Sequence, residues 1–269
     1  MPATASPLSR SAVTTKLRAA GCVFADDEAR LLLAAARTPA ELADMVDRRT
    51  AGLPLEQVLG WAEFCGLRIF LDPGVFVPRR RTEFLVAQAL DCLPPAGTAA
   101  ARPRVVLDLC CGSGAVGAAM VAAAPGLDLS SVDIDPVAVT CARRNLEAVG
   151  GRVYAGDLYE PLPVSLRGRV DIIVANAPYV PTGSIGMMPP EARIHESPVA
   201  LDGGADGLDV QRRVCAGARP WLAPGGQLLI ETSERQAVAT CEVMAGHGLV
   251  GRVTHSDHLD ATVVVGVVQ

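Results

Sequence analysis

The sequence predicts an α/β protein whose sheet is mainly parallel and covered by helices on both faces, preceded by a small helical domain and a linking hairpin. Two observations support this prediction. From residue 104 onward, apolar runs of strand length alternate with segments of helical spacing, the order that βαβ units give. Before residue 60, apolar residues recur at helical spacing with no strand-like run between them. We therefore expect a helical domain at 1–60, a β-hairpin at 61–82 and an α/β domain at 83–269.

The first two parts are predicted from helix starts and turn residues. The expected helices are 12–20, 26–36 and 40–49. Thr38-Pro39 marks the start of the third, because proline suits the first helical position. Two apolar runs, 61–71 and 75–77, flank an Asp-Pro-Gly tripeptide at 72–74, so we place the turn of the hairpin there. A helix at 83–93 opens the last part and ends before the Pro-Pro-Ala-Gly stretch at 94–97.

Seven strands and four further helices are expected after residue 104. The strands are 105–109, 129–133, 152–155, 170–176, 227–231, 249–254 and 262–268, and the helices are 116–123, 136–149, 210–221 and 235–244. The last two strands have a connection too short for a crossover helix, which predicts that they pair antiparallel. Residues 181–209 form a long connection rich in proline and glycine, and such loops are usually functional lids or disordered segments.

The composition is that of a folded globular chain with no sign of a membrane or nucleic-acid partner. Hydrophobic residues make up 50% and charged residues 20%. No apolar run approaches the roughly 18 residues of a membrane span, and no secretory signal opens the chain. The net charge of −5 offers no basic excess for phosphates. The eight cysteines contain no C-x-x-C pair, which favours reduced thiols, and His255-x-x-His258 lacks the partners of a metal site. We expect a cytoplasmic protein without a metal.

A glycine-rich turn follows the first expected strand and opens a helix. The run from Asp108 to Gly117 contains Gly-x-Gly-x-x-Gly, and Asp133 lies about 20 residues further on, where a ribose hydroxyl would need an acceptor. The pattern alone is weak, but strand, turn, helix and acid occur in the right order. We therefore favour a nucleoside cofactor over a merely tight turn, with cofactor contacts at Cys110, Cys111, Gly112, Ser113 and Gly114.

Asp108 distinguishes between two classes of cofactor. A carboxylate at the end of the first strand would repel the diphosphate of NAD, whereas it would attract the ammonium and sulfonium groups of S-adenosylmethionine. The competing interpretation, a helix-capping or turn residue, is less favoured at a buried strand end. We therefore expect S-adenosylmethionine, with an NAD oxidoreductase as a remote alternative.

Polar residues follow four successive strands of the predicted sheet. Asp157 lies just beyond the third strand, where it would accept from an adenine amino group, although a solvated loop carboxylate is a serious competitor. Together with Asp108, Asp133 and Asn176, it lies at the carboxyl edge, where open α/β sheets bind ligands, so we expect all four to contact the cofactor.

Asn176-Ala177-Pro178-Tyr179 is the most informative stretch of the chain. It follows the buried-strand run 170–175, so the Asn176 amide oxygen and the Ala177 carbonyl would accept the two N–H bonds of a planar NH2 group. Such a grip aims the nitrogen lone pair at an electrophile, and orientation of this kind lowers a methyl-transfer barrier. Tyr179 is expected to pack against the acceptor plane or to serve as a core aromatic. The pattern resembles the signature of amino-group methyltransferases.

These motifs together resemble the protein-(glutamine-N5) methyltransferases of the PrmC/HemK family. The resemblance runs from about residue 49 to the C-terminus. Four further segments carry it, at 49–54, 59–64, 76–83 (Phe-Val-Pro-Arg-Arg-Arg-Thr-Glu) and 200–208 (Ala-Leu-Asp-Gly-Gly-Ala-Asp-Gly-Leu). It implies a Rossmann-like, seven-stranded class I methyltransferase domain with a small helical N-terminal domain.

The chain departs from the family pattern at three places. Ala177 replaces the first proline of Asn-Pro-Pro-Tyr, which keeps the backbone carbonyl but loses the fixed φ of proline. Cys110 replaces the first glycine of the cofactor loop. The helical region before residue 49 is short. A related subfamily with Asn-x-Pro-Tyr resembles the chain best.

The resemblance implies methyl transfer from S-adenosylmethionine to the side-chain amide nitrogen of a glutamine in a protein, such as a release factor or ribosomal protein. An adenine-N6 nucleic-acid methyltransferase is the main alternative, because an exocyclic amine fits the same grip. The acidic balance and the 4% aromatic content speak against it. A non-catalytic S-adenosylmethionine-binding protein is the second alternative.

Overall fold

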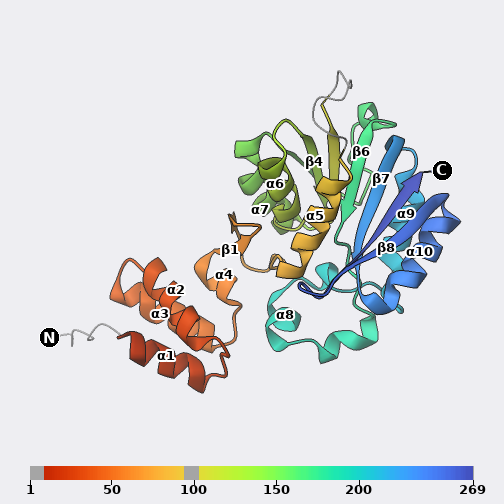
Figure 1. The fold of residues 1–269 in the computed structure, drawn as a ribbon. Helices are drawn as coiled ribbons and strands as arrows, with labels where there is room; N and C mark the ends of the chain where they lie inside the picture. The colour runs from red at the N-terminus through yellow and green to blue at the C-terminus, as the bar shows by residue number, and fades with distance from the viewer. Residues whose placement is uncertain (1–8, 94–102, 269) are drawn as a thin grey trace.

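The computed structural model describes residues 9–93 and 103–268, and the Pro-Pro-Ala-Gly stretch at 94–97, expected to end a helix, lies outside them. Figure 1 shows a group of N-terminal helices beside an α/β unit built on one sheet. The helices before the sheet are α1 (Arg10–Ala19), α2 (Ala25–Ala35), α3 (Pro39–Thr50), α4 (Leu55–Leu59) and α5 (Glu83–Asp91). Those that follow its first strand are α6 (Ala115–Ala123), α7 (Pro136–Leu146), α8 (Pro190–His195), α9 (Asp209–Ala218) and α10 (Ala237–Gly246).

Capping and an apolar interface explain the N-terminal helices. The Ser9 hydroxyl accepts from the Ala12 N–H at the start of α1, and the Thr38 hydroxyl accepts from the Glu41 N–H at the start of α3. Their apolar faces bury a core of their own, which includes Val13, Leu17, Leu32, Met45 and Val46. The three predicted helices are confirmed to within about two residues. The domain boundary near residue 60 remains a prediction.

The linking hairpin exists, but the predicted turn was wrong. Strand β1 (Trp61–Phe64) pairs antiparallel with β2 (Leu67–Phe70) around Cys65 and Gly66. Both turn residues have positive φ, +49° and +73°, which suits the tight two-residue turns that match strand twist. The Asp-Pro-Gly tripeptide does turn the chain, since the Val75 N–H donates to the Asp72 carbonyl at 3.2 Å. However, residues 75–77 form no strand.

The sheet has seven strands in the order β5-β4-β3-β6-β7-β9-β8. They are β3 (Val105–Leu109), β4 (Asp128–Asp133), β5 (Arg152–Ala155), β6 (Val170–Ala175), β7 (Leu222–Thr232), β8 (Leu249–Ser256) and β9 (Ala261–Val268). The first five are parallel, and β9 runs antiparallel to both of its neighbours. The antiparallel pairing of the last two strands was predicted. Strand β7 begins five residues earlier than predicted, because Leu222 pairs with Val170 before a register shift.

Alternation along the strands divides the core into two layers. Val106, Ile172 and Leu229 face the layer that α5, α6 and α7 cover, while Leu107, Ile173 and Leu228 face the layer under α9 and α10. Because both faces are covered, the central strands are apolar throughout. The order of strands reverses at β3, so its loop and that of β6 diverge and leave a crevice at their carboxyl ends. Within the described ranges, no helix combines the length and apolar character needed to cross a bilayer.

Candidate active site

A single continuous cavity lies at the carboxyl edge of β3, β4 and β6, with an empty volume of about 1380 Å³ including its mouth. It brings together all the residues that the sequence predicted for the site except Gly114. The predicted residues that line it are Asp108, Cys110, Cys111, Gly112, Ser113, Asp133, Asp157, Asn176, Ala177, Pro178 and Tyr179. Gly114 stands behind it, at the N-cap of α6 with φ of +77°.

The glycine-rich loop is tight and partly strained. Gly112 has φ of +54° and donates its N–H to Asp133 Oδ2 at 2.7 Å, which joins the loop to the end of β4. Cys110 also has positive φ, +56°, at the position where the family pattern has glycine. A residue with a side chain is strained in this left-handed region, which explains why glycine is favoured there. A hydrogen bond from the Asn145 amide to the Ser113 carbonyl, 2.8 Å long, supports the loop from α7.

Asp108 combines burial with a position on the cavity wall. Its side chain is only 2% exposed, and Oδ2 accepts from the Gly117 N–H at 3.1 Å in the first turn of α6. Burial raises the pKa of this carboxyl to about 7, against the Gly117 bond, with the nearby Asp133 adding to the rise. Asp108 therefore does stabilise the helix start, as the competing interpretation held. Its burial also leaves a carboxylate that a cationic ligand would stabilise.

Asp133 and Asp157 occupy the ends of the next two strands. Asp133 accepts from Gly112 and, through Oδ1, from the Asp135 N–H at 2.9 Å; burial raises its pKa. Asp157 forms an ion pair with Arg213 of α9, with an N···O distance of 2.5 Å. This pair had no signal in the sequence, and it restricts the carboxylate that we expected to face an adenine amino group.

The Asn176 amide is held by a residue from another part of the chain. Its Nδ2 donates to the Thr82 hydroxyl at 3.3 Å, and Thr82 belongs to the short 3-10 turn Arg80–Thr82 before α5. With Nδ2 used in this way, Oδ1 is the amide atom left to accept from a ligand. Ala177 is 1% exposed, so its side chain is packed.

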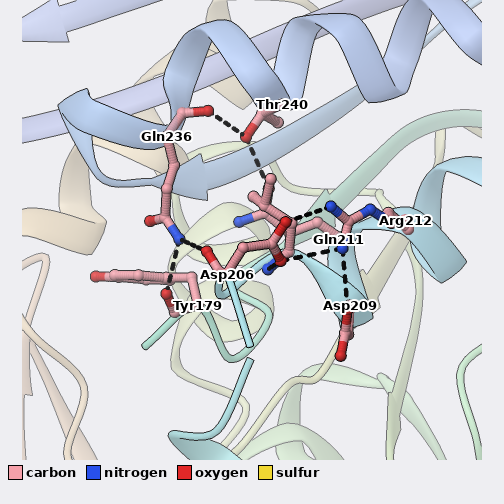
Figure 2. A network of polar contacts seen from close by, with 8 residues as sticks. Tyr179, Asp206, Asp209, Gln211, Arg212, Gln236 and Thr240 are labelled. Carbon is pink, nitrogen blue, oxygen red and sulfur yellow. Dashed lines mark hydrogen bonds and ion pairs between the residues drawn. The ribbon is translucent and has the colours of Figure 1, made fainter. Parts of the chain in front are cut away.

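Tyr179 is held through both its side-chain hydroxyl and its backbone carbonyl. Its hydroxyl lies 3.5 Å from Oε1 of Glu231, and its backbone carbonyl accepts from the Gln236 amide at 3.0 Å. Figure 2 shows that the same Gln236 nitrogen also donates to the Asp206 carbonyl, at 3.0 Å. Gln236 therefore ties the loop at 200–208 to the Asn-Ala-Pro-Tyr loop.

Further hydrogen bonds, at least partly buried, hold Gln236 in place. The Thr240 hydroxyl donates to Gln211 Oε1 at 2.8 Å, and its distance to the Gln236 carbonyl is 3.1 Å (Figure 2). On the outer side, Arg212 pairs with Asp206 and with Asp209, which fixes the end of the loop against α9. The two segments that the sequence singled out separately are thus parts of one network.

The connection 181–209 forms one wall of the cavity, through Met188, Ser197, Val199, Ala200 and Leu201. Its helix α8 is joined to the N-terminal helices. Arg49, 7% exposed, pairs with Glu28 at 2.7 Å and with Glu191 of α8 at 2.7 Å. The Gln57 amide donates to the His195 carbonyl at 3.1 Å. The wall of the cavity therefore depends on contacts from outside the α/β unit. Figure 1 shows α8 on the side of that unit that faces the N-terminal helices.

The same wall is joined to the segment that precedes α5. Glu196, whose side chain is fully buried, accepts through Oε1 from the Val77 N–H at 3.2 Å and from Arg79 at 2.6 Å. Arg79 therefore forms a partly buried ion pair, since its own side chain is 34% exposed. No group of three or more His, Cys, Asp or Glu side chains suited to a metal occurs in the described part of the chain.

Sequence reasoning missed Thr82, Asn145, Arg213, Glu231 and Gln236 as parts of the site. Glu231 had a usable signal, because a charged residue ends the apolar run Leu228–Ile230 of a predicted strand, the rule that selected the other strand-end residues. The others lie within helices, turns or polar segments and give no such signal. Their roles depend on contacts between residues far apart in the sequence.

Comparison with known proteins agrees with this geometry. Residues 67–206 match the family described as "Methyltransferase small domain". The release factor glutamine methyltransferase of Geobacter sulfurreducens is 38% identical over 233 residues, which cover 85% of this chain and 78% of the relative. A 4-amino-L-phenylalanine/4-methylamino-L-phenylalanine methyltransferase of Streptomyces pristinaespiralis is 36% identical, covering 78% and 70%.

Among solved structures, the 16S rRNA N2 G1207 methyltransferase of T. Thermophilus, in complex with AdoMet and guanosine, superposes with a TM-score of 0.52 at 22% identity. The match covers 78% of this chain and 50% of that one, and it bears on the fold alone. The sheet order and cavity position agree with a class I methyltransferase fold. The chain belongs to the release factor glutamine methyltransferase family, whose enzymes depend on S-adenosylmethionine.

Proposed function

We propose that the chain transfers a methyl group from S-adenosylmethionine to the side-chain amide nitrogen of a glutamine in a bacterial release factor, in the cytoplasm. The observation that carries the proposal is the cavity that contains both a buried carboxylate, Asp108, and the amide Asn176 with its nitrogen already bonded. Eight free thiols suit a reducing compartment.

The cofactor half of the cavity, formed at the ends of β3, β4 and β5, fits S-adenosylmethionine chemically. Asp108 supplies negative charge for an ammonium or sulfonium group, and Asp133 supplies carboxylate oxygens for ribose hydroxyls. Apolar walls from Val116, Val132 and Leu158 suit the face of a nucleobase. When bound, S-adenosylmethionine supplies an electrophilic methyl group on sulfur.

The acceptor half of the cavity, formed around Asn176, Ala177 and Tyr179, would orient the amide nitrogen of the substrate and stabilise its developing charge. Asn176 Oδ1 and the Ala177 carbonyl accept the two N–H bonds, which fixes the plane of the amide and turns the lone pair toward the methyl carbon. One C–N bond forms as the C–S bond breaks, and the sulfur keeps the electron pair. The methylated nitrogen then releases one proton to water, so no strong base is required.

The test is transfer of tritiated methyl from S-adenosylmethionine to a purified release factor made in cells that lack methylation of it. We expect one methyl group per release factor, recovered as N5-methylglutamine after digestion, and loss of transfer in the Asn176→Ala variant. Cofactor binding by calorimetry serves as the control, because this variant should keep it.

Two further acceptors are assayed in parallel. DNA and RNA oligonucleotides test the adenine-N6 alternative, and 4-amino-L-phenylalanine tests an aryl amine, the acceptor named for the Streptomyces pristinaespiralis relative. Transfer to either of these and not to the release factor would overturn the proposal. Cofactor binding without transfer to any acceptor would favour a non-catalytic protein.

A further inference from the structure

One buried acid at the acceptor side has no role in the chemistry described above. Glu231 lies near the end of β7 and is 1% exposed. Its Oε2 atom has no hydrogen-bond partner among the described residues. A buried carboxylate without a full set of donors is costly, so a protein that retains one must gain something from it.

The groups that face Glu231 come from three segments. The Tyr179 hydroxyl lies 3.5 Å from Oε1, the Thr82 hydroxyl interacts with the carboxylate, and the Arg81 guanidinium is close enough to stabilise its charge. Burial raises the pKa of Glu231 to about 7, and these three groups oppose the rise. The acid therefore changes charge near neutral pH.

Thr82 connects this acid to the amide that grips the acceptor. The hydroxyl of a threonine has one hydrogen, and the Asn176 Nδ2 donates to its oxygen at 3.3 Å. That hydrogen must therefore point to a different acceptor, and the Glu231 carboxylate is beside it. The direction of donation is then set throughout: Asn176 to Thr82, and Thr82 to Glu231.

The direction matters because the two ends of an amide have opposite hydrogen-bonding character. If Asn176 turned by 180°, its NH2 group would face the cavity and would meet the N–H bonds of the acceptor donor to donor. A protonated Glu231 would favour that turn, since its hydroxyl would donate to Thr82 and release the threonine hydrogen toward Asn176.

We propose that Glu231 and Thr82 are positioning residues that hold Asn176 with Oδ1 toward the acceptor nitrogen. The proposal rests on the proposed function, in which Asn176 grips the acceptor amide. Glu231 does not line the cavity, whereas Thr82 does, so ionised Glu231 acts on Asn176 through Thr82. Transfer should therefore need Glu231 without its proton.

Kinetics of the full-length chain with release factor as the acceptor test this. Glu231→Gln and Thr82→Val should each lower kcat, by up to about 100-fold, because a small misplacement of a gripping atom has effects of that size. The dissociation constant of S-adenosylmethionine should stay within about twofold. Thr82→Ser keeps the hydroxyl and should restore most of kcat. Thr14→Val, the same change at a buried threonine of α1, controls for loss of a buried hydroxyl.

The pH profile separates positioning from packing. For the wild type at saturating cofactor, kcat should fall as pH drops below about 7 and should be constant above it. In Glu231→Gln the profile should be flat across this range at a lower level. A wild-type profile without this inflection, or a Glu231→Gln variant that keeps both the inflection and the wild-type kcat, would overturn the proposal.

A second measurement needs no turnover. In ¹⁵N-labelled protein, the side-chain NH2 signal of Asn176, assigned by its loss in Asn176→Ala, should shift with pH near 7 in the wild type and not in Glu231→Gln. Its exchange with water should be faster in Thr82→Val. If the release factor accepts no methyl but these shifts occur, the proposed function fails and the positioning network stands. Absence of the shifts contradicts the network whatever the acceptor.

Discussion

The two halves of the cavity are built in different ways. The cofactor half comes from three consecutive strand ends within about 50 residues of chain, and the Gly112–Asp133 bond joins its loop to the end of β4. The acceptor half brings together residues that are spread over more than 150 positions of the chain, namely Thr82, Asn176, Tyr179, Glu231 and Gln236. A local motif fixes the first half, whereas the second requires the whole fold. Substitutions at residues far from the cavity should therefore change the kinetics of the acceptor more than the affinity for the cofactor.

The largest expected effect is at the centre of the acceptor half. Asn176→Ala should lower kcat by about 10²–10³-fold, the usual cost of removing one preorganised polar group from a reacting centre. The dissociation constant for S-adenosylmethionine should change by less than about threefold. Calorimetry and single-turnover kinetics measure the two separately. An equal loss in both would mean that the two halves are not separate.

The matching change in the cofactor half is Asp108→Asn. It should weaken S-adenosylmethionine by roughly 30-fold or more, because it removes one partner of a buried charge pair. In the wild type, affinity should also fall as pH drops below about 7, where Asp108 gains a proton. The variant should lose this pH dependence. Calorimetry between pH 6 and 8 checks both, and a wild-type affinity that is constant across that range would contradict the assignment.

Asp108→Asn also has an expected effect on stability. The pKa of Asp108 is about 7 in the folded chain, and its ordinary value is 3.8. Between these two pH values, the carboxyl keeps its proton in the folded chain and has lost it in the unfolded chain. The free energy of unfolding of the cofactor-free protein should therefore fall as pH rises through this window and level off above it. The variant should have a higher Tm than the wild type at pH 8, and the difference should narrow at pH 5.

The contrast between the halves also explains what the sequence could predict. The sequence pointed to the cofactor loop and to four strand-end residues of the cavity, since strand, turn and helix signals are local in the chain, but it did not point to Glu231 at the end of β7. The Asn-Ala-Pro-Tyr loop was recognised by its pattern, but its support was not. Nothing near Gln236 in the sequence indicates a bond to Tyr179, and nothing near Asp157 indicates Arg213. The hairpin turn was misplaced because Asp-Pro-Gly is the stronger local signal, whereas strand pairing selected Cys65-Gly66.

A smaller effect is expected where the acceptor half depends on the N-terminal helices. Glu191→Gln removes one of the two carboxylates on Arg49 and leaves the buried Glu28 pair in place. Because Glu191 is half exposed, the loss should be about 1 kcal/mol or less. We expect a KM for release factor raised by up to about fivefold. Cofactor affinity should not change.

The control for that change is Asp47→Asn, which removes an exposed ion pair with Lys16 in the same group of helices. This variant should have wild-type kinetics, because the pair is solvent-exposed and, among the described residues, forms no ion pair with α8. A similar rise in KM for both variants would show that the effect comes from surface charge and not from the contact with the cavity wall.

The smallest effect concerns the strained residue in the cofactor loop. Cys110 has φ of +56°, and the penalty for a side chain there is about 1–2 kcal/mol. Glycine avoids this penalty but has a more disordered unfolded state, which costs about 0.4–1 kcal/mol. Cys110→Gly should therefore be more stable than Cys110→Ala by about 0.5–1 kcal/mol, because both variants lose the thiol and the strain that glycine avoids exceeds its entropic cost. Cys111, the next residue, does not have positive φ, so Cys111→Ala should be more stable than Cys111→Gly. Denaturant unfolding measures all four variants. If alanine were more stable than glycine at position 110 as well as at 111, the loop would relieve the strain at Cys110. Replacing the family glycine would then carry no strain penalty.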